Sequence, residues 1–146
     1  ADSYGLELNH IKAHGALYNQ MIIDAELSNL YLDTIKDFKK KCSLYIPYKS
    51  EIEKIALKKG FSIIYEVFGD RNYNDDLSLV SRNNENALIT DPESVVNHIK
   101  TIKETESVKT INGNFKKIKF DTICIHSDTN NSIEILKKIN QEFGES

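Results

Sequence analysis

The sequence is poor in cysteine and has no long apolar run. Cys42 and Cys124 are its only cysteines. They make neither a disulfide framework nor a CxxC metal site, so a reducing cytoplasm is the expected location. No stretch approaches the ~20 apolar residues that a membrane-spanning helix needs. The first ten residues lack the basic and apolar regions of a signal peptide.

Arginine is the second scarcity, because only Arg71 and Arg82 stand among the 19 basic residues. Arginine binds carboxylates and phosphates in a fixed, bidentate geometry, whereas lysine is a mobile point charge. We therefore predict a geometric role in ligand binding for both arginines. Two surface ion pairs are the alternative.

Several motifs and charge patterns are also absent. The net charge of −3 argues against nucleic acid or an anionic membrane as a partner. The sequence contains no GxxxxGK[ST] phosphate loop, no GxGxxG, no HExxH and no GxSxG. The length of 146 residues, with 40% hydrophobic and 28% charged residues, fits one globular domain over residues 1–146.

Strand-like and helix-like segments alternate along the chain, which is typical of α/β folds. We expect strands at 6–14, 42–46, 61–68 and 120–125, a hairpin at 108–118, and helices at 16–40, 50–60, from 91 onward and at 133–143. Ser50 and Glu53 form a capping box, and Asp91 caps the helix that begins with Pro92. Because helices connect the strong strands, the sheet is expected to be mostly parallel.

Three polar clusters follow strand ends. The first contains Lys12, His14, Tyr18 and Asn19, the second contains Glu66, Asp70, Arg71, Tyr73 and Arg82, and the third contains His126 and Asp128. In parallel α/β folds, ligands bind at the carboxyl ends of the strands. The three clusters therefore predict one site at that edge of the sheet.

The second cluster leaves alternatives open. Glu66 lies in an apolar strand, where a carboxylate is costly unless it is paired, so it needs Lys12, Arg71 or a metal ion nearby. The neighbouring Asp70 and Arg71 could also form a simple ion pair within the loop.

The first and third clusters have equally plain alternatives. His14 could be a structural residue, although Gly15 allows close approach of the backbone. His126 and Asp128 are candidates for an acid/base or metal-binding pair, but Asp128 could instead cap the last helix. Outside the three clusters, Asp75 and Asp76 are expected in a solvated turn.

Three blocks carry a family resemblance. HIKAHGALYNQ resembles the KPHGALYN block of the LamB/YcsF family, EVFGDRNYNDDLSLVSR resembles its EVFADRxYxxDGxLVxR block, and DTICIHSD resembles its DTICVHGD block. The blocks occur in the family's order, and the match extends over nearly the whole chain. It corresponds to the C-terminal part of the family's members.

The resemblance implies a fold and an activity. The fold would be part of an irregular parallel β/α barrel of the glycoside hydrolase/deacetylase type. The activity would be the ATP-dependent opening of 5-oxoproline to L-glutamate with partner subunits B and C, which would help to handle ATP. A divalent metal ion is compatible with the resemblance, with its ligands expected in the part of the family that this chain does not match.

The side chains suggest roles at the matching positions. His14, Glu66, Asp70, His126 and Asp128 are the candidate catalytic residues. The candidate substrate-binding residues are Lys12, Tyr18, Asn19, Arg71, Tyr73 and Arg82. Arg71 or Arg82 would clamp the substrate carboxylate or a phosphorylated intermediate. His14 or His126, together with Asp128, would activate a water molecule or transfer a proton.

The chain departs from the family's blocks at a few positions. Gly69 replaces alanine, and Leu77 and Ser127 replace glycines, which permit backbone angles that other residues avoid. Three functions remain open: a component of 5-oxoprolinase, a non-catalytic half-barrel that binds a partner, and a metal-dependent hydrolase related to deacetylases. An open half-barrel leaves strand edges exposed, so pairing with an N-terminal half chain or self-association is expected.

Overall fold

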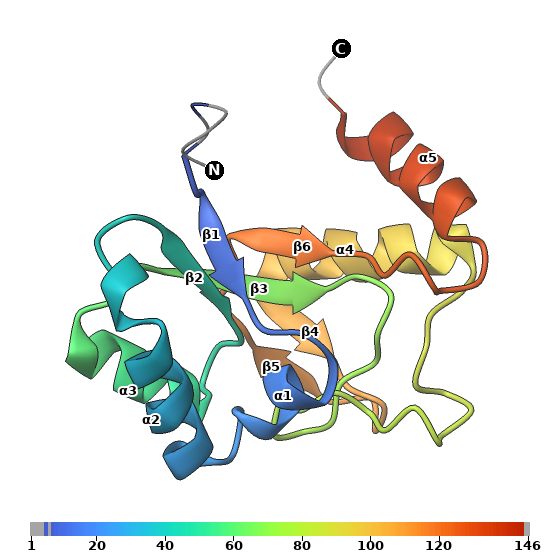
Figure 1. Cartoon of the computed structure of the whole chain (residues 1–146). Coiled ribbons are helices and arrows are strands. Elements are labelled where there is room, and N and C mark those ends of the chain that lie inside the picture. The colour runs from blue at the N-terminus through green and yellow to red at the C-terminus, as the bar shows by residue number, and fades with distance from the viewer. Residues whose placement is uncertain (1–4, 6, 145–146) are drawn as a thin grey trace. The chain divides into compact units, whose positions relative to one another are not determined.

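A computed structural model describes residue 5 and residues 7–144 of the chain. Leu6, the first residue of the first predicted strand, lies outside the described residues. The chain divides into two compact units, Ala1–Glu66 and Val67–Ser146. Figure 1 shows the elements of each unit. No helix in the described part of the chain is long and apolar enough to cross a membrane.

The first unit contains parallel strands and short helices. Its elements are β1 (His10–Lys12), α1 (Gly15–Gln20), α2 (Ala25–Thr34), the 3-10 helix η2 (Lys36–Phe38), β2 (Ser43–Ile46), α3 (Glu51–Lys59) and most of β3 (Ile63–Phe68). β1 pairs with β2, and β2 with β3, both in parallel. The prediction of parallel strands joined by helices is confirmed for this unit.

The single helix predicted over 16–40 is wrong, because the segment is divided among α1, α2 and η2. Asp24 is the N-cap of α2 and adopts an extended backbone, and its carboxylate accepts a hydrogen bond from the Leu27 N–H at 2.9 Å. An aspartate that caps a helix cannot at the same time continue an earlier one. The apolar spacing concealed this start signal.

The capping signals of α3 are confirmed at both ends. The Ser50 hydroxyl accepts a hydrogen bond from the Glu53 N–H at 3.2 Å. The Glu53 carboxylate reaches back to the backbone N–H of Lys49, one residue before the cap. At the other end, Gly60 has a φ of 73°, which glycine adopts without the clash of a Cβ atom.

The second unit is organised around α4 and α5. Its elements are the end of β3, α4 (Pro92–Thr105), β4 (Ser107–Lys109), β5 (Phe115–Lys117), β6 (Thr122–Cys124) and α5 (Ser132–Phe143). Asp91 caps α4 as predicted, with its carboxylate accepting from the Ser94 N–H at 2.8 Å. Val95 and Ile99 of α4 pack with Ile135 of α5 in a buried cluster.

A loop with no helix or regular strand joins β3 to α4, as the polar sequence of this segment predicts. It contacts the antiparallel hairpin of β4 and β5 through Asp75, whose carboxylate accepts hydrogen bonds from Thr110, Asn112 and Asn114. The predicted turn at Asp75 and Asp76 is confirmed, and Asp75 in addition connects this turn to the hairpin. In the same loop Leu77 has a φ of 69°, the left-handed region that the family's glycine adopts more easily.

Strand β6 is the neighbour of β3 in the sheet. The N–H of Gly69, directly after β3, donates to the Cys124 carbonyl of β6 at 3.0 Å. This pairing places the residues that follow both strands at one edge of the second unit.

Candidate active site

Asp70 and His126 form the central pair of the second unit. Asp70 stands two residues after β3, and His126 stands two residues after β6. The His126 Nδ1 atom lies 3.0 Å from Asp70 Oδ1, and the His126 backbone N–H donates to Asp70 Oδ2 at 2.8 Å. The Thr129 hydroxyl donates to the same oxygen at 2.6 Å. The second and third predicted clusters therefore meet here.

The surroundings of Asp70 keep its buried carboxyl group ionised. Burial by itself would raise the pKa of Asp70, but the hydrogen bonds from His126 and Thr129 outweigh it, and the pKa is lowered from its ordinary value. An ionised carboxylate only accepts hydrogen bonds, so Nδ1 of His126 carries the proton of the neutral ring. The Nε2 atom is then the basic nitrogen, as in the histidine of a Ser-His-Asp triad.

Aromatic contacts hold the His126 ring in place. The ring stacks on Phe68 with a centroid distance of 5.1 Å and an interplanar angle of 11°. Phe68 is fixed in turn by Tyr73, whose hydroxyl accepts a hydrogen bond from the Phe68 N–H at 2.8 Å. Tyr73 is buried, so this hydroxyl supports the end of β3, and substrate binding by Tyr73 stays a prediction.

Arg82 and Asp128 form an exposed ion pair in the same unit. Arg82 Nη1 lies 2.8 Å from Asp128 Oδ2. The hydrogen bond from Arg82 lowers the pKa of Asp128. The alternative in which Asp128 caps the last helix is wrong, because Asn131 occupies the N-cap position of α5. Both side chains are about half exposed and accessible to a ligand.

Arg71 is buried and organises the loop between β3 and α4. Its Nη2 donates to the Val80 carbonyl at 2.7 Å, and its Nε donates to the Ala87 carbonyl at 3.4 Å. Asp70 and Arg71 make no direct ion pair among the described residues, since Asp70 bonds to His126 and Thr129. The simple loop ion pair is therefore wrong, while contact of Arg71 with a substrate stays a prediction.

The first unit contains a buried ion pair of its own. Lys12 Nζ lies 2.6 Å from Glu66 Oε1, and the Glu66 side chain is only 4% exposed. Among the partners predicted for Glu66, the structure shows Lys12. The other carboxylate oxygen, Oε2, is buried without a hydrogen-bond partner among the described residues. A ligand N–H or O–H could satisfy it.

The remaining predicted residues of the first unit lie around α1. His14 is the N-cap residue of α1 and is exposed, without a side-chain capping bond. Tyr18 is buried on this helix, and Asn19 is exposed. Their part in catalysis or binding stays a prediction.

The described part of the chain contains no cluster of side chains that could bind a metal ion. Among those residues, no group of three or more His, Cys, Asp or Glu side chains could hold a metal ion. Structural zinc sites need four protein ligands and catalytic ones typically three. A divalent ion would therefore need further ligands from outside the described residues.

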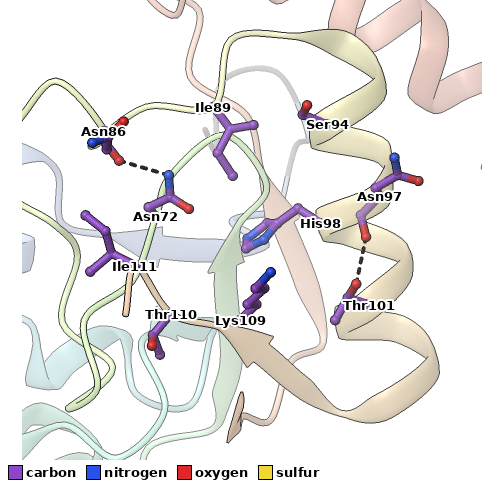
Figure 2. Close-up of a pocket in the computed structure, with 10 residues that line it drawn as sticks. All are labelled: Asn72, Asn86, Ile89, Ser94, Asn97, His98, Thr101, Lys109, Thr110 and Ile111. Carbon is purple, nitrogen blue, oxygen red and sulfur yellow. Dashed lines mark hydrogen bonds between the residues drawn. The ribbon is translucent and has the colours of Figure 1, made fainter. Parts of the chain in front are cut away.

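Sequence reasoning missed two residues near the central pair. The position of Thr129 could have been predicted, because a hydroxyl three residues after His126 can reach the same edge of the sheet. The position of His98 could have been predicted as well, since it stands on α4 at helical spacing from the buried Val95 and Ile102. Figure 2 shows His98 among the residues that line a cavity of about 500 Å³ in the second unit.

Comparison with known proteins gives consistent matches. The chain is 37% identical over 147 residues to the A subunit of 5-oxoprolinase from Pyrococcus abyssi, covering 99% of this chain and 58% of that protein. It is 40% identical over 144 residues to the corresponding 5-oxoprolinase protein of Campylobacter jejuni, covering 98% of this chain and 56% of that protein. The chain thus spans somewhat more than half the length of these relatives.

A solved structure is similar as well. The crystal structure of a lactam utilization protein from Thermus thermophilus matches with a TM-score of 0.83 and 27% identity, over 97% of this chain and 57% of that one. This similarity and the parallel strands confirm the predicted fold class, an α/β fold that is part of a parallel β/α barrel. The model of the LamB/YcsF family matches residues 1–146, and the chain belongs to this family.

Proposed function

We propose that the chain is a component of a 5-oxoprolinase, which opens the lactam of 5-oxoproline to L-glutamate in an ATP-dependent reaction with partner subunits B and C. The observation that carries the proposal is the Asp70–His126 pair, whose ionised carboxylate orients a histidine base. The names of the similar proteins, a 5-oxoprolinase component and a lactam utilization protein, supply the substrate class.

In this proposal His126 moves the protons of the ring opening. Its Nε2 takes a proton from a water molecule while the water oxygen bonds to the lactam carbonyl carbon. The bond between that carbon and the ring nitrogen then breaks, and the nitrogen receives the proton from Nε2–H. The carboxylate of Asp70 stabilises the imidazolium between the two transfers.

The other polar residues would bind ligand groups. Arg82 is exposed and could exchange its partner Asp128 for the substrate carboxylate. In the first unit, Glu66 Oε2 is suited to accept a ligand N–H, with Lys12 neutralising its charge. ATP would supply the driving force for opening a stable amide. Because the sequence has no phosphate-loop motif, we assign the binding of ATP to the partner subunits.

The test is an assay of 5-oxoproline-dependent ATP hydrolysis and glutamate release. The chain is combined with subunits B and C, with and without a chain that supplies the rest of the relatives' length. Replacement of the proton carrier, His126→Gln, is expected to lower the rate by about 10²–10⁴-fold. Asp70→Asn is expected to do the same, because it no longer selects the required tautomer.

The matched control is His10→Gln, which removes an imidazole that stacks on Tyr45 in the first unit. It is expected to leave the rate unchanged. Full activity of His126→Gln would overturn the proposed role of the pair. Binding of 5-oxoproline without turnover in every assembly would instead favour the non-catalytic binding module.

A further inference from the structure

A second binding site is suggested by the cavity in Figure 2, which lies between α4, the end of β4 and the loop that follows β3. Its volume of about 500 Å³ is in the range of small-molecule sites. Neither Asp70 nor His126 lines it. A ligand in this cavity would therefore be distinct from one at the proposed catalytic pair.

His98 is the most informative residue of the cavity. Its Nε2 atom is buried and has no hydrogen-bond partner among the described residues. The ring stacks on Tyr73 with a centroid distance of 6.2 Å. A buried polar atom without a partner is costly, and a ligand that donates a hydrogen bond would remove this cost.

The protonation of His98 defines what it can bind. Burial lowers the pKa of His98, although the Phe68 backbone and Asp70 oppose this change. The ring is therefore neutral near pH 7. A neutral imidazole carries one proton, and we place it on Nδ1, which leaves Nε2 unprotonated, the atom that has no partner among the described residues. Nε2 is then an acceptor for a ligand N–H or O–H.

The rest of the lining favours an anionic ligand with further polar groups. Lys109 is the only charged side chain of the lining, which contains no carboxylate. Figure 2 shows Lys109 and His98 directed toward the same space from β4 and α4. The side-chain amide of Asn72 also lines the cavity, and one of its N–H groups donates to the Asn86 carbonyl. The Thr110 hydroxyl donates its proton to Asp75, so it can only accept from a ligand.

We propose that this cavity binds a small carboxylic acid with an amide N–H, the N–H bonding to His98 Nε2 and the carboxylate pairing with Lys109. 5-Oxoproline has this chemistry, and choosing it as the ligand rests on the proposed function. The cavity thus serves as a second site for the lactam acid, separate from the Asp70–His126 pair.

Calorimetric titration of the full chain with 5-oxoproline tests the proposal. His98→Phe keeps a ring to stack on Tyr73 but removes Nε2, and Lys109→Met removes the charge. Each is expected to weaken binding at least about tenfold, since each removes a hydrogen bond or ion pair to the ligand. Lys117→Met on β5 is the matched control outside the lining and is expected to bind like the parent chain.

A second ligand tests the role of the N–H. Cyclopentanecarboxylate has the same ring size and carboxylate but no amide, so it is expected to bind at least about tenfold more weakly. Lys109 is exposed, so its variant stays informative even where His98→Phe does not fold.

The results separate this site from the proposed function. Asp70→Asn is expected to lose turnover and to keep this binding. Parent-like binding by both His98→Phe and Lys109→Met, equal binding of cyclopentanecarboxylate, or no binding of 5-oxoproline by the parent chain would each overturn the second site. None of these binding results would test the proposed function, which depends on the turnover measured for His126→Gln.

Discussion

Asp70 receives two hydrogen-bonding groups of one residue, His126. The ring Nδ1 lies 3.0 Å from Oδ1, and the backbone N–H donates to Oδ2 at 2.8 Å. The backbone bond fixes where the chain leaves β6, and the ring bond fixes how the imidazole is turned. One buried carboxylate thus sets both the position and the tautomer of the proposed base.

Thr129→Val tests the support of Asp70 by its third donor. The substitution removes the hydroxyl that donates to Oδ2 at 2.6 Å and nearly keeps the side-chain volume. Because the buried carboxylate loses a hydrogen-bond donor, the substitution is expected to lower the free energy of unfolding by about 1–3 kcal/mol. The pKa of Asp70 is expected to rise, which a carbon-detected NMR titration would measure.

Thr105→Val is the control, because its hydroxyl is exposed and bonds only to the preceding helix turn. It is expected to change the free energy of unfolding much less. Equal stability of the Thr129 variant and the parent would show that Oδ2 does not depend on this bond.

Arg71→Lys tests how the loop after β3 is held. One ammonium group cannot reproduce the fork that reaches the carbonyls of Val80 and Ala87. The substitution is expected to lower the free energy of unfolding by about 1–3 kcal/mol, because a buried carbonyl is left without its hydrogen-bond donor. Hydrogen exchange is expected to speed up between residues 80 and 88. Loss of 5-oxoproline turnover with unchanged exchange would instead favour a direct substrate contact.

Gly69→Ala tests the close packing beside Asp70. A Cβ atom at this position would lie 2.8 Å from Ile125 Cδ1 and 3.0 Å from Ile99 Cδ1. The family's alanine would meet only the ends of two isoleucine side chains, which can shift, so we expect a small destabilisation of about 1 kcal/mol in denaturant unfolding. The double variant Gly69→Ala/Ile125→Val removes the nearer methyl group and should recover part of the loss. No recovery would show that the crowding lies elsewhere.

Asp75 predicts a pH dependence of stability. Hydrogen bonds from Thr110, Asn112 and Asn114 lower its pKa from 3.8 to about 2. Between these values the unfolded chain binds more protons than the folded chain, so the free energy of unfolding falls as the pH decreases toward 2. Asp75→Asn is expected to reduce this slope in acid unfolding curves. An unchanged slope would contradict the contribution of Asp75, and Asp37→Asn controls for the change of charge.

Local signals predicted much of the fold. The Ser50–Glu53 cap, the αL residue Gly60 and the Asp91-Pro92 start were all readable, because each acts within a few residues of the chain. The break at Asp24 was missed, since apolar spacing continued on both sides of it. At this position the N-cap formed by Asp24 begins a new helix, although the spacing of apolar residues predicts a continuous one.

Sequence patterns also placed the polar clusters after the correct strands, but they left the partners open. Asp70 had a neighbour of opposite charge in Arg71, yet it bonds to His126, 56 residues away. Arg71 instead binds backbone carbonyls of its own loop. Both sets of hydrogen bonds depend on which groups the tertiary fold brings together, because a buried charge is costly unless nearby groups form hydrogen bonds with it.

The amino-acid sequence alone therefore defined the fold class, the caps and the candidate residues, since all three depend on short-range patterns and recognisable blocks. Tertiary packing decided that Asp70 orients His126, that Lys12 neutralises Glu66, and that His98 has a free acceptor at a cavity. The physical reason is that hydrogen bonds and desolvation act between atoms in space, and their partners come from distant parts of the chain.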